Sequence, residues 1–160
     1  MTSNALTTWL WFDDEAEEAA RFYTGVFKDS AMGSVSRYGD AGPRPAGMVM
    51  VVQFELNGQR FAALNGGDEG FSFDESVSFS IPCADQDEVD YYWDRLRDGG
   101  EEVACGWLKD RFGLSWQVIP VEFEKLMSDP DPEKVQRVTA AMLKMKKLDV
   151  SELRRAYDGG

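Results

Sequence analysis

In the amino-terminal part of the chain, a short strand-like run is followed by apolar side chains at helical spacing. Residues 6–12 predict a β-strand with two largely apolar faces, one with Trp9 and Trp11 and the other with Leu10 and Phe12, so this strand is expected to be covered on both sides. Apolar residues then recur at helical spacing and predict a helix over residues 15–27, opened by Asp14 and Glu17 as a capping box. Three further strands are predicted, at residues 31–38, 48–56 and 60–64. The order of elements is strand, helix and three strands.

Asn57-Gly58 joins two of these strands and is the strongest two-residue signal for a hairpin turn in the chain. The same order of elements then begins again at Val77. A strand over residues 77–83 leads into a helix for which Asp85 is the N-cap, with Glu88 three residues later. We interpret this recurrence, at a spacing of roughly 70 residues, as an internal duplication of a βαβββ unit.

Residues 101–120 predict a second hairpin, whose strands are expected at residues 103–109 and 114–119. Gly113 closes the turn between them, because glycine adopts the positive φ that a tight turn often needs. The second unit therefore ends in strands, as the first does.

After Pro120 the pattern becomes helical, with a turn near residues 122–127 and longer helices over residues 133–147 and 148–157. We therefore expect an α+β protein of paired βαβββ units with carboxy-terminal helices. The predicted boundaries are residues 1–75 for the first unit, 76–120 for the second and 121–160 for the helical extension, together forming one compact domain.

The composition excludes several classes of partner. A net charge of −12 repels phosphate backbones, so we expect no nucleic-acid binding. No run of about 18 apolar residues and no secretory signal are present, which predicts no membrane insertion and a cytoplasmic location. Cys83 and Cys105 form no CxxC pair, so they are interpreted as buried thiols.

The chain contains no histidine. Histidine-dependent triads, general bases and metal ligands are therefore excluded. Residues 65–70 are rich in glycine and follow a strand, but a further strand and not a helix is predicted after them. An ordinary connection is thus favoured over a loop that holds phosphate or S-adenosylmethionine.

Paired βαβββ units of this length resemble the vicinal oxygen chelate superfamily, with its glyoxalase and bleomycin-resistance proteins. Four segments resemble one branch more closely, the PhnB-like proteins often labelled 3-demethylubiquinone-9 3-methyltransferase. They read WFDDEAEEAARFYTGVF, FELNGQRFAALNGG, CGWLKDRFGLSWQVIP and DPDPEKVQRVTAAMLKMKKLD. The resemblance covers nearly the whole chain and implies the glyoxalase/bleomycin resistance-like fold.

The resemblance also indicates where metal-binding members carry their ligands, at the middle of the first and last strand of each unit. The matching positions here are Thr7, a residue near Ala62, Ser78 and Gln117. Only Gln117 offers even a weak oxygen ligand, so no metal and no other cofactor is expected.

The function expected from this reading is metal-independent binding of a small molecule whose identity the sequence leaves open. An aromatic pocket on the sheet faces opposite the helices is predicted, lined by Trp9, Trp11, Ser78, Ser80, Trp107, Lys109, Ser115 and Gln117. Core packing remains the alternative for the tryptophans. Lys109 and Arg111 are open to two interpretations, a solvated turn or a clamp for an anionic ligand.

Two other functions stay open. The chain could be an enzyme of the PhnB-like family, with the nominal methyltransferase activity or a lyase-type activity, in which a carboxylate or Cys105 acts beside Arg111. Alternatively it could be a structural dimer without a ligand. A homodimer is expected in any case, because open sheet edges need covering. The apolar stripe on the carboxy-terminal helices, Val135, Val138, Met142 and Met145, is its predicted contact surface.

Overall fold

The computed structural model describes residues 4–160 of the chain. It divides into two compact units, Met1–Ser72 and Phe73–Gly160. Within the described residues, no helix has both the length and the apolar character that crossing a bilayer would require. The predicted boundaries of the subdomains and the single compact domain stay predictions.

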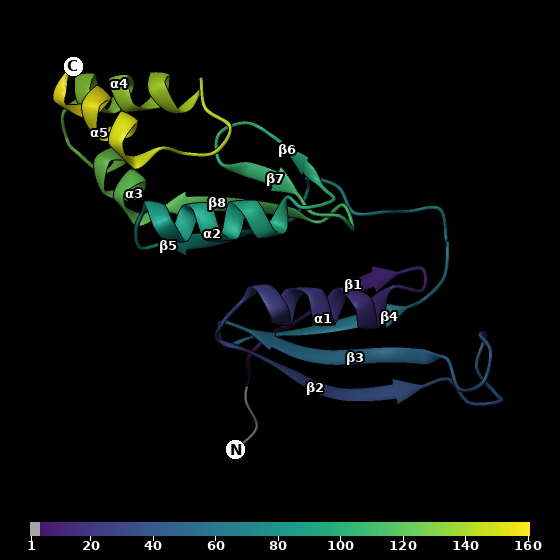
Figure 1. Ribbon diagram of the computed structural model, residues 1–160. Helices are drawn as coiled ribbons and strands as arrows, with labels where there is room; N and C mark the ends of the chain where they lie inside the picture. The colour runs from purple at the N-terminus through teal and green to yellow at the C-terminus, as the bar shows by residue number, and fades with distance from the viewer. Residues whose placement is uncertain (1–3) are drawn as a thin grey trace. The chain divides into compact units, whose positions relative to one another are not determined.

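The first unit is a four-stranded sheet with one helix (Figure 1). Its strands follow the order β1-β4-β3-β2, with β1 parallel to β4 and the other neighbours antiparallel. The turn between β3 and β4 has positive φ at Asn57 and Gly58, as the sequence predicts. The elements are β1 Thr7–Phe12, α1 Ala16–Val26, β2 Ser30–Arg37, β3 Val49–Leu56 and β4 Gln59–Asn65.

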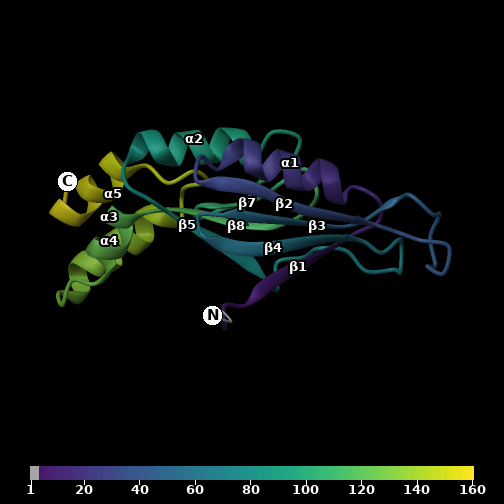
Figure 2. The same ribbon diagram turned by 90° about the horizontal axis from the view of Figure 1, so that it is seen from below.

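Helix α1 packs on one face of this sheet, against β3 above all (Figure 2). Tyr23 of α1 stacks on Phe54 with ring centroids 6.2 Å apart, and Phe54 stacks on Phe61 at 5.3 Å. All three side chains are buried. The core of the first unit therefore lies between α1 and one sheet face, and the opposite face carries no helix of this unit.

The start of α1 is held by Asn65, a residue at the far end of β4. Asn65 is 2% exposed; its Oδ1 accepts from the Ala16 backbone N–H at 2.8 Å, and its Nδ2 donates to the Val49 carbonyl at 3.0 Å. The Tyr38 hydroxyl donates to the Asn65 carbonyl at 2.6 Å. The predicted Asp14–Glu17 capping box is therefore wrong: Glu15 is the N-cap residue and makes no side-chain cap bond.

We expect Asn65→Leu to destabilise the first unit by about 2 to 4 kcal/mol, because it leaves the buried Ala16 N–H and the partly buried Val49 carbonyl without their partner. Urea unfolding, followed together with amide hydrogen exchange of α1, measures this loss. Gln59→Ala is the matched control, since Gln59 is exposed and its amide makes one long hydrogen bond to Thr8. Equal stability of the two variants would contradict the role given to Asn65.

The second unit repeats the same topology, with strand order β5-β8-β7-β6 and β5 parallel to β8. Asp85 caps α2 by accepting from the Glu88 backbone N–H at 2.9 Å, which confirms the predicted N-cap. The paired βαβββ architecture is thus confirmed. The elements are β5 Ser78–Cys83, α2 Gln86–Leu96, β6 Glu101–Glu102, β7 Trp107–Lys109 and β8 Ser115–Pro120.

The carboxylate of Asp110 organises the turn between β7 and β8. It accepts from the backbone N–H groups of Phe112 and Leu114 and from the Trp116 indole at 2.9–3.1 Å. The strand predicted at residues 103–109 is shorter than expected, because Cys105 (φ 60°) and Gly106 (φ 85°) form a left-handed turn. This turn separates β6 from β7.

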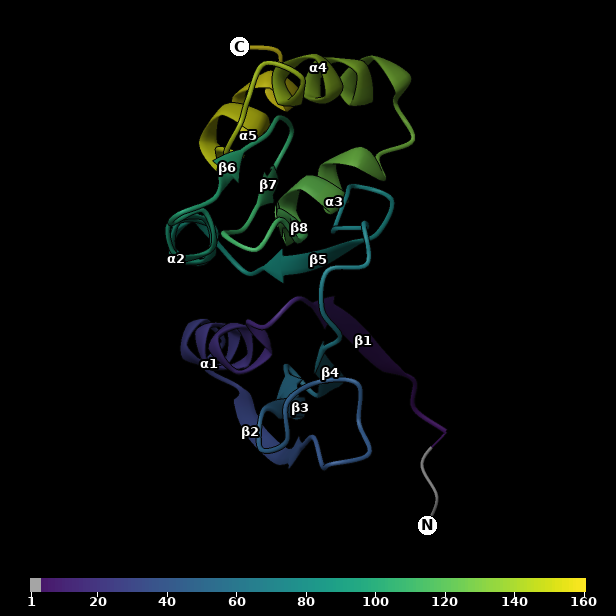
Figure 3. The ribbon, with the colours of Figure 1, turned by 90° about the vertical axis from the view of Figure 1, so that its right-hand side faces the viewer.

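Three helices complete the second unit and lie together in Figure 3. The predicted helix over residues 133–147 ends earlier, at Met142, and Asp149 caps the last helix by accepting from the Glu152 N–H. Their bounds are α3 Val121–Met127, α4 Pro132–Met142 and α5 Val150–Asp158.

The apolar stripe of these helices packs onto its own chain. Val138 is 0% exposed in a cluster with Leu148 and Leu153, and Met142 and Met145 pack against that cluster. Val138, at the centre of the stripe predicted as the dimer contact, is therefore already covered by its own chain. The homodimer itself stays a prediction.

Val138→Asp should unfold the helical part of the second unit, with a loss of at least about 3 kcal/mol, because it buries a carboxylate among aliphatic side chains. Leu143→Asp is the matched control: Leu143 is 63% exposed one residue after α4, and a change of about 0.5 kcal/mol or less is expected there. Circular dichroism during thermal unfolding, with sedimentation in parallel, measures both. A folded Val138→Asp chain that has merely become monomeric would refute the intramolecular packing.

Candidate ligand site on the open sheet faces

The face of the first sheet opposite α1 is called here the open face of the first unit. Its side chains form three rows across the strands, as the strand registers show. The rows are Thr7, Arg60, Glu55 and Ala31; Trp9, Ala62 and Gln53; and Trp11, Leu64, Val51 and Ser36. One end of the face is therefore charged and the other is apolar and aromatic.

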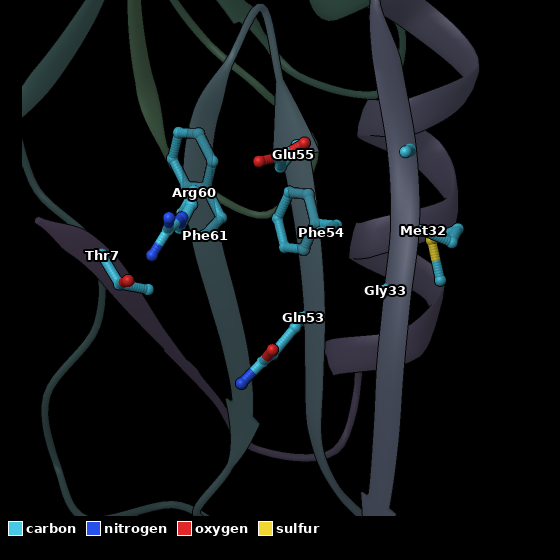
Figure 4. Close-up of a pocket in the computed structure, with 9 residues that line it drawn as sticks. Thr7, Met32, Gly33, Gln53, Phe54, Glu55, Arg60 and Phe61 are labelled. Atoms are coloured by element: carbon cyan, nitrogen blue, oxygen red, sulfur yellow. The ribbon is translucent and has the colours of Figure 1, made fainter. Parts of the chain in front are cut away.

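A hollow of about 390 Å³ lies at the charged end of this face. Figure 4 shows Gln53 and Glu55 on β3, Arg60 on the neighbouring strand β4 and Thr7 on β1. The hollow is lined by Thr7, Ala31, Met32, Gly33, Gln53, Phe54, Glu55, Arg60 and Phe61. Side chains of opposite charge, an amide and a hydroxyl thus surround one cavity.

Sequence reasoning did not find this hollow, although it found the hairpin that forms it. A two-residue turn at Asn57-Gly58 pairs Leu56 with Gln59, and so it also pairs Glu55 with Arg60. The register was therefore available from the sequence. The cavity was not, because its other wall comes from β2, whose contacts with β3 include a shift of register between Met32 and Val35.

Trp9 and Trp11 lie on the open face, as predicted. Trp9 is 57% exposed and Trp11 is 37% exposed, so neither is a core residue of the first unit. The Trp11 indole donates to the Gly67 carbonyl at 2.9 Å, and its ring meets Phe71 edge-on at 5.2 Å. Trp11 is thus held in place by the glycine-rich connection.

The other six predicted residues share the face of the second sheet opposite α2. The registers place Ser78 beside Ser115, which neighbours Lys109, and Ser80 beside Gln117, which neighbours Trp107. Gln117 Nε2 donates to Ser78 Oγ at 2.9 Å. Ser115 is 1% exposed, and its hydroxyl has no hydrogen-bond partner among the described residues. The structure therefore brings these six residues together on one sheet of the second unit, whereas Trp9 and Trp11 belong to the sheet of the first unit.

Both cations of the second hairpin are already paired. Lys109 contacts the carboxylate of Glu75, and this hydrogen bond raises the pKa of Lys109 and lowers the pKa of Glu75. Arg111 pairs with Asp98 at 3.0 Å. A ligand anion would have to displace these carboxylates, so the geometry favours surface ion pairs over an anion clamp.

The two cysteines differ in environment. Cys83 is buried, and burial raises the pKa of its thiol to about 12, which leaves it protonated and unreactive at neutral pH. Cys105 is only half-buried, which corrects the expectation of two buried thiols. Its backbone N–H donates to the Met145 carbonyl at 2.9 Å, so the turn around Cys105 anchors the loop after α4.

Comparison with known proteins identifies the family. The family model for 3-demethylubiquinone-9 3-methyltransferase matches residues 4–119. The chain belongs to this family. It is 34% identical to the PhnB protein of Bacillus cereus, which bears the same family name; the match covers 72% of this chain and 98% of that one, with a TM-score of 0.66. The predicted resemblance to the PhnB-like proteins is confirmed.

More distant structures share the fold of this family member. A crystallised protein from Pseudomonas aeruginosa is 20% identical over 74% of this chain and 98% of its own, with a TM-score of 0.60. The fosfomycin resistance protein FosX of Listeria monocytogenes, crystallised with Mn(II), is 17% identical over 72% of this chain and 90% of its own, with a TM-score of 0.51. Among proteins with curated descriptions, no match was found.

The metal positions of the superfamily hold no suitable ligand set in this family member. Thr7 and Ala62 offer a hydroxyl and a methyl group, and the amide of Gln117 is bonded to the hydroxyl of Ser78. The described residues contain no group of three acidic, histidine or cysteine side chains able to hold a metal ion. A divalent ion prefers several carboxylate or imidazole donors, so these positions do not fit one.

The glycine-rich connection also does not fit the S-adenosylmethionine that the family name implies. A Cβ at Gly66 would lie 2.1 Å from the Trp11 ring, so this glycine is needed for packing against the tryptophan. The Gly67 carbonyl accepts a hydrogen bond from the same indole. The element that follows is strand β5, so the connection does not lead into a helix amino terminus.

We expect that S-adenosylmethionine does not bind this protein, because the N–H groups of Gly66 and Gly67 already donate to the Phe12 and Asp13 carbonyls and the connection leads into a strand. Isothermal titration at ligand concentrations up to about 1 mM, where even an affinity of −4 kcal/mol is detected, is the measurement. Saturable binding that Gly66→Ala abolishes would contradict the interpretation. Thermal unfolding of that variant must be recorded in parallel, since it displaces Trp11.

Proposed function

We propose that this protein binds a small organic molecule on the open face of its first unit, without the help of a metal ion. The hollow between β1, β2, β3 and β4 is the observation that supports this function. Its volume, about 390 Å³, falls within the range of about 300–1,000 Å³ that is typical of small-molecule sites. Polar groups from three strands converge on it, which is the usual arrangement for orienting a ligand.

The neighbouring rows supply the apolar part of such a site. Trp9 follows Thr7 by two residues on the same face of β1, and successive side chains of one strand face lie about 6–7 Å apart. A ligand held in the hollow can therefore extend its apolar portion towards an exposed indole. Exposed aromatic surface of this kind in a protein often serves a binding function.

Metal independence follows from the chemistry of the residues present. The hollow contains one carboxylate, that of Glu55, and an arginine in the facing position of the neighbouring strand. Arginine repels a divalent cation, and one carboxylate is too few to replace the water shell of such an ion. We infer that binding relies on hydrogen bonds and charge pairs with the protein.

Filling the hollow tests this function. Ala31→Leu places a larger side chain into the cavity. It should lower the affinity for any ligand of the hollow at least about tenfold, which corresponds to about 1.4 kcal/mol. Native mass spectrometry of the protein from its host, followed by thermal-shift screening of a metabolite library with and without EDTA, measures binding. Ser36→Leu on the same strand, outside the hollow, is the matched control.

The proposal fails if no molecule co-purifies and none of the library stabilises the wild-type protein. It also fails if EDTA removes the stabilisation, since that outcome would make the binding metal-dependent. Ligands that bind equally to Ala31→Leu and Ser36→Leu would place the site elsewhere.

A further inference from the structure

We infer that the hollow of the first unit recognises a small zwitterion of the α-amino-acid type, with its anionic group at Arg60 and its ammonium group at Glu55. This inference rests on the function proposed above and names the class of ligand. Arg60 and Glu55 occupy facing positions on neighbouring strands, and both line the cavity. Each charged group of the ligand would then face a protein side chain of opposite charge.

Arg60 is the first reason for this assignment. The other three arginines of the first unit have partners: Arg21 pairs with Glu17, Arg37 donates to the Gly47 carbonyl and Arg44 donates to the Asp13 carbonyl. Among residues 4–160, no ion pair or hydrogen bond is formed by the guanidinium of Arg60. A guanidinium with free donors beside a cavity is suited to a carboxylate, which it binds through two parallel hydrogen bonds.

Glu55 is the second reason, because it decides which anions are acceptable. Its carboxylate also takes part in none of the ion pairs among the described residues, although Arg60 is its direct cross-strand neighbour. A simple anion at Arg60 would be repelled by Glu55 and by the acidic chain, whose net charge is −12. A simple cation at Glu55 would be repelled by Arg60. A ligand that carries both charges satisfies both side chains.

The spacing of the two side chains sets the size of the charged group. Directly opposed residues of antiparallel strands have Cα atoms about 4.5–5.5 Å apart, so their charged ends meet a ligand within a few atoms of one another. An amino group and a carboxylate on one carbon atom have this compact spacing. Longer dipolar molecules would reach past one of the two partners.

Small residues keep room for this group. Ala31 ends the charged row on β2, and Gly33 follows it on the same strand. A Cβ at Gly33 would lie 2.9 Å from the Gln53 carbonyl, so a larger residue could not take its place without moving β3. The amide of Gln53 and the hydroxyl of Thr7 remain available for the polar atoms of the ligand. Trp9 lies in the adjoining row and favours a ligand whose own side chain is aromatic.

L-Phenylalanine is the probe that tests the inference, with N-acetyl-L-phenylalanine and L-phenylalaninamide as matched compounds that lack one charge each. Titration of the full-length, ¹⁵N-labelled protein should show shifts of the β3 and β4 amides with L-phenylalanine at about 0.1–1 mM. Each derivative should bind at least about tenfold more weakly, since each loses one charge-assisted contact.

Two variants test which side chain binds which charged group of the ligand. Arg60→Gln should lose at least about tenfold in affinity for L-phenylalanine and should no longer discriminate against the amide. Glu55→Gln should no longer discriminate against the N-acetyl compound. Arg21→Gln is the control, because Arg21 lies on α1 and its partner is Glu17. Thermal unfolding should be nearly the same for all three variants, as the three side chains are exposed.

The inference is wrong if the free amino acid, the amide and the N-acetyl compound bind alike, or if none of them shifts the β3 and β4 amides. It is also wrong if Arg60→Gln binds as the wild type does. A library ligand that Ala31→Leu abolishes and Arg60→Gln leaves unchanged would refute the zwitterion and keep the proposed function. The absence of every ligand would remove both.

Discussion

A four-stranded sheet has two faces, and one helix can cover only one of them. In the first unit α1 buries Tyr23 against Phe54 and leaves Trp9 exposed on the other side. The second unit repeats this arrangement with α2 and the face that carries Trp107 and Gln117. In each unit, one sheet face thus packs against the helix to form the core, and the other face carries the polar and aromatic side chains of the candidate site. Everything proposed about function depends on this division.

In each unit, one buried polar side chain fixes the positions of neighbouring elements. Asn65 connects the end of β4 to the first turn of α1 and to β3, and Asp110 joins three donors around the last hairpin turn. Both residues are nearly inaccessible, so their hydrogen bonds are costly to lose. A shift of one residue in either strand would exchange the buried and open faces. These contacts therefore protect the open faces as well as the cores.

FosX, which shares the fold, was crystallised with Mn(II), whereas the strand positions at which metal ligands were expected carry Thr7, Ser78 and Gln117 in this chain. The connection after β4 packs on Trp11 and leads into strand β5, not into a helix. What remains is a cavity with opposed charges at Arg60 and Glu55, which suits recognition of an organic ligand better than Lewis-acid chemistry.

The sequence by itself determined the paired βαβββ topology, the Asn57-Gly58 and Gly113 turns, and the Asp85 cap, because these depend on the period of apolar residues and on neighbours within a few positions. It also placed Trp9 and Gln117 on the correct strand faces. Only the tertiary structure decided that Asn65 caps α1, that Val138 is buried in its own chain, and that Glu55 and Arg60 border a cavity with β2. Each of these joins residues distant in the chain, and side-chain periodicity carries no information about such pairs.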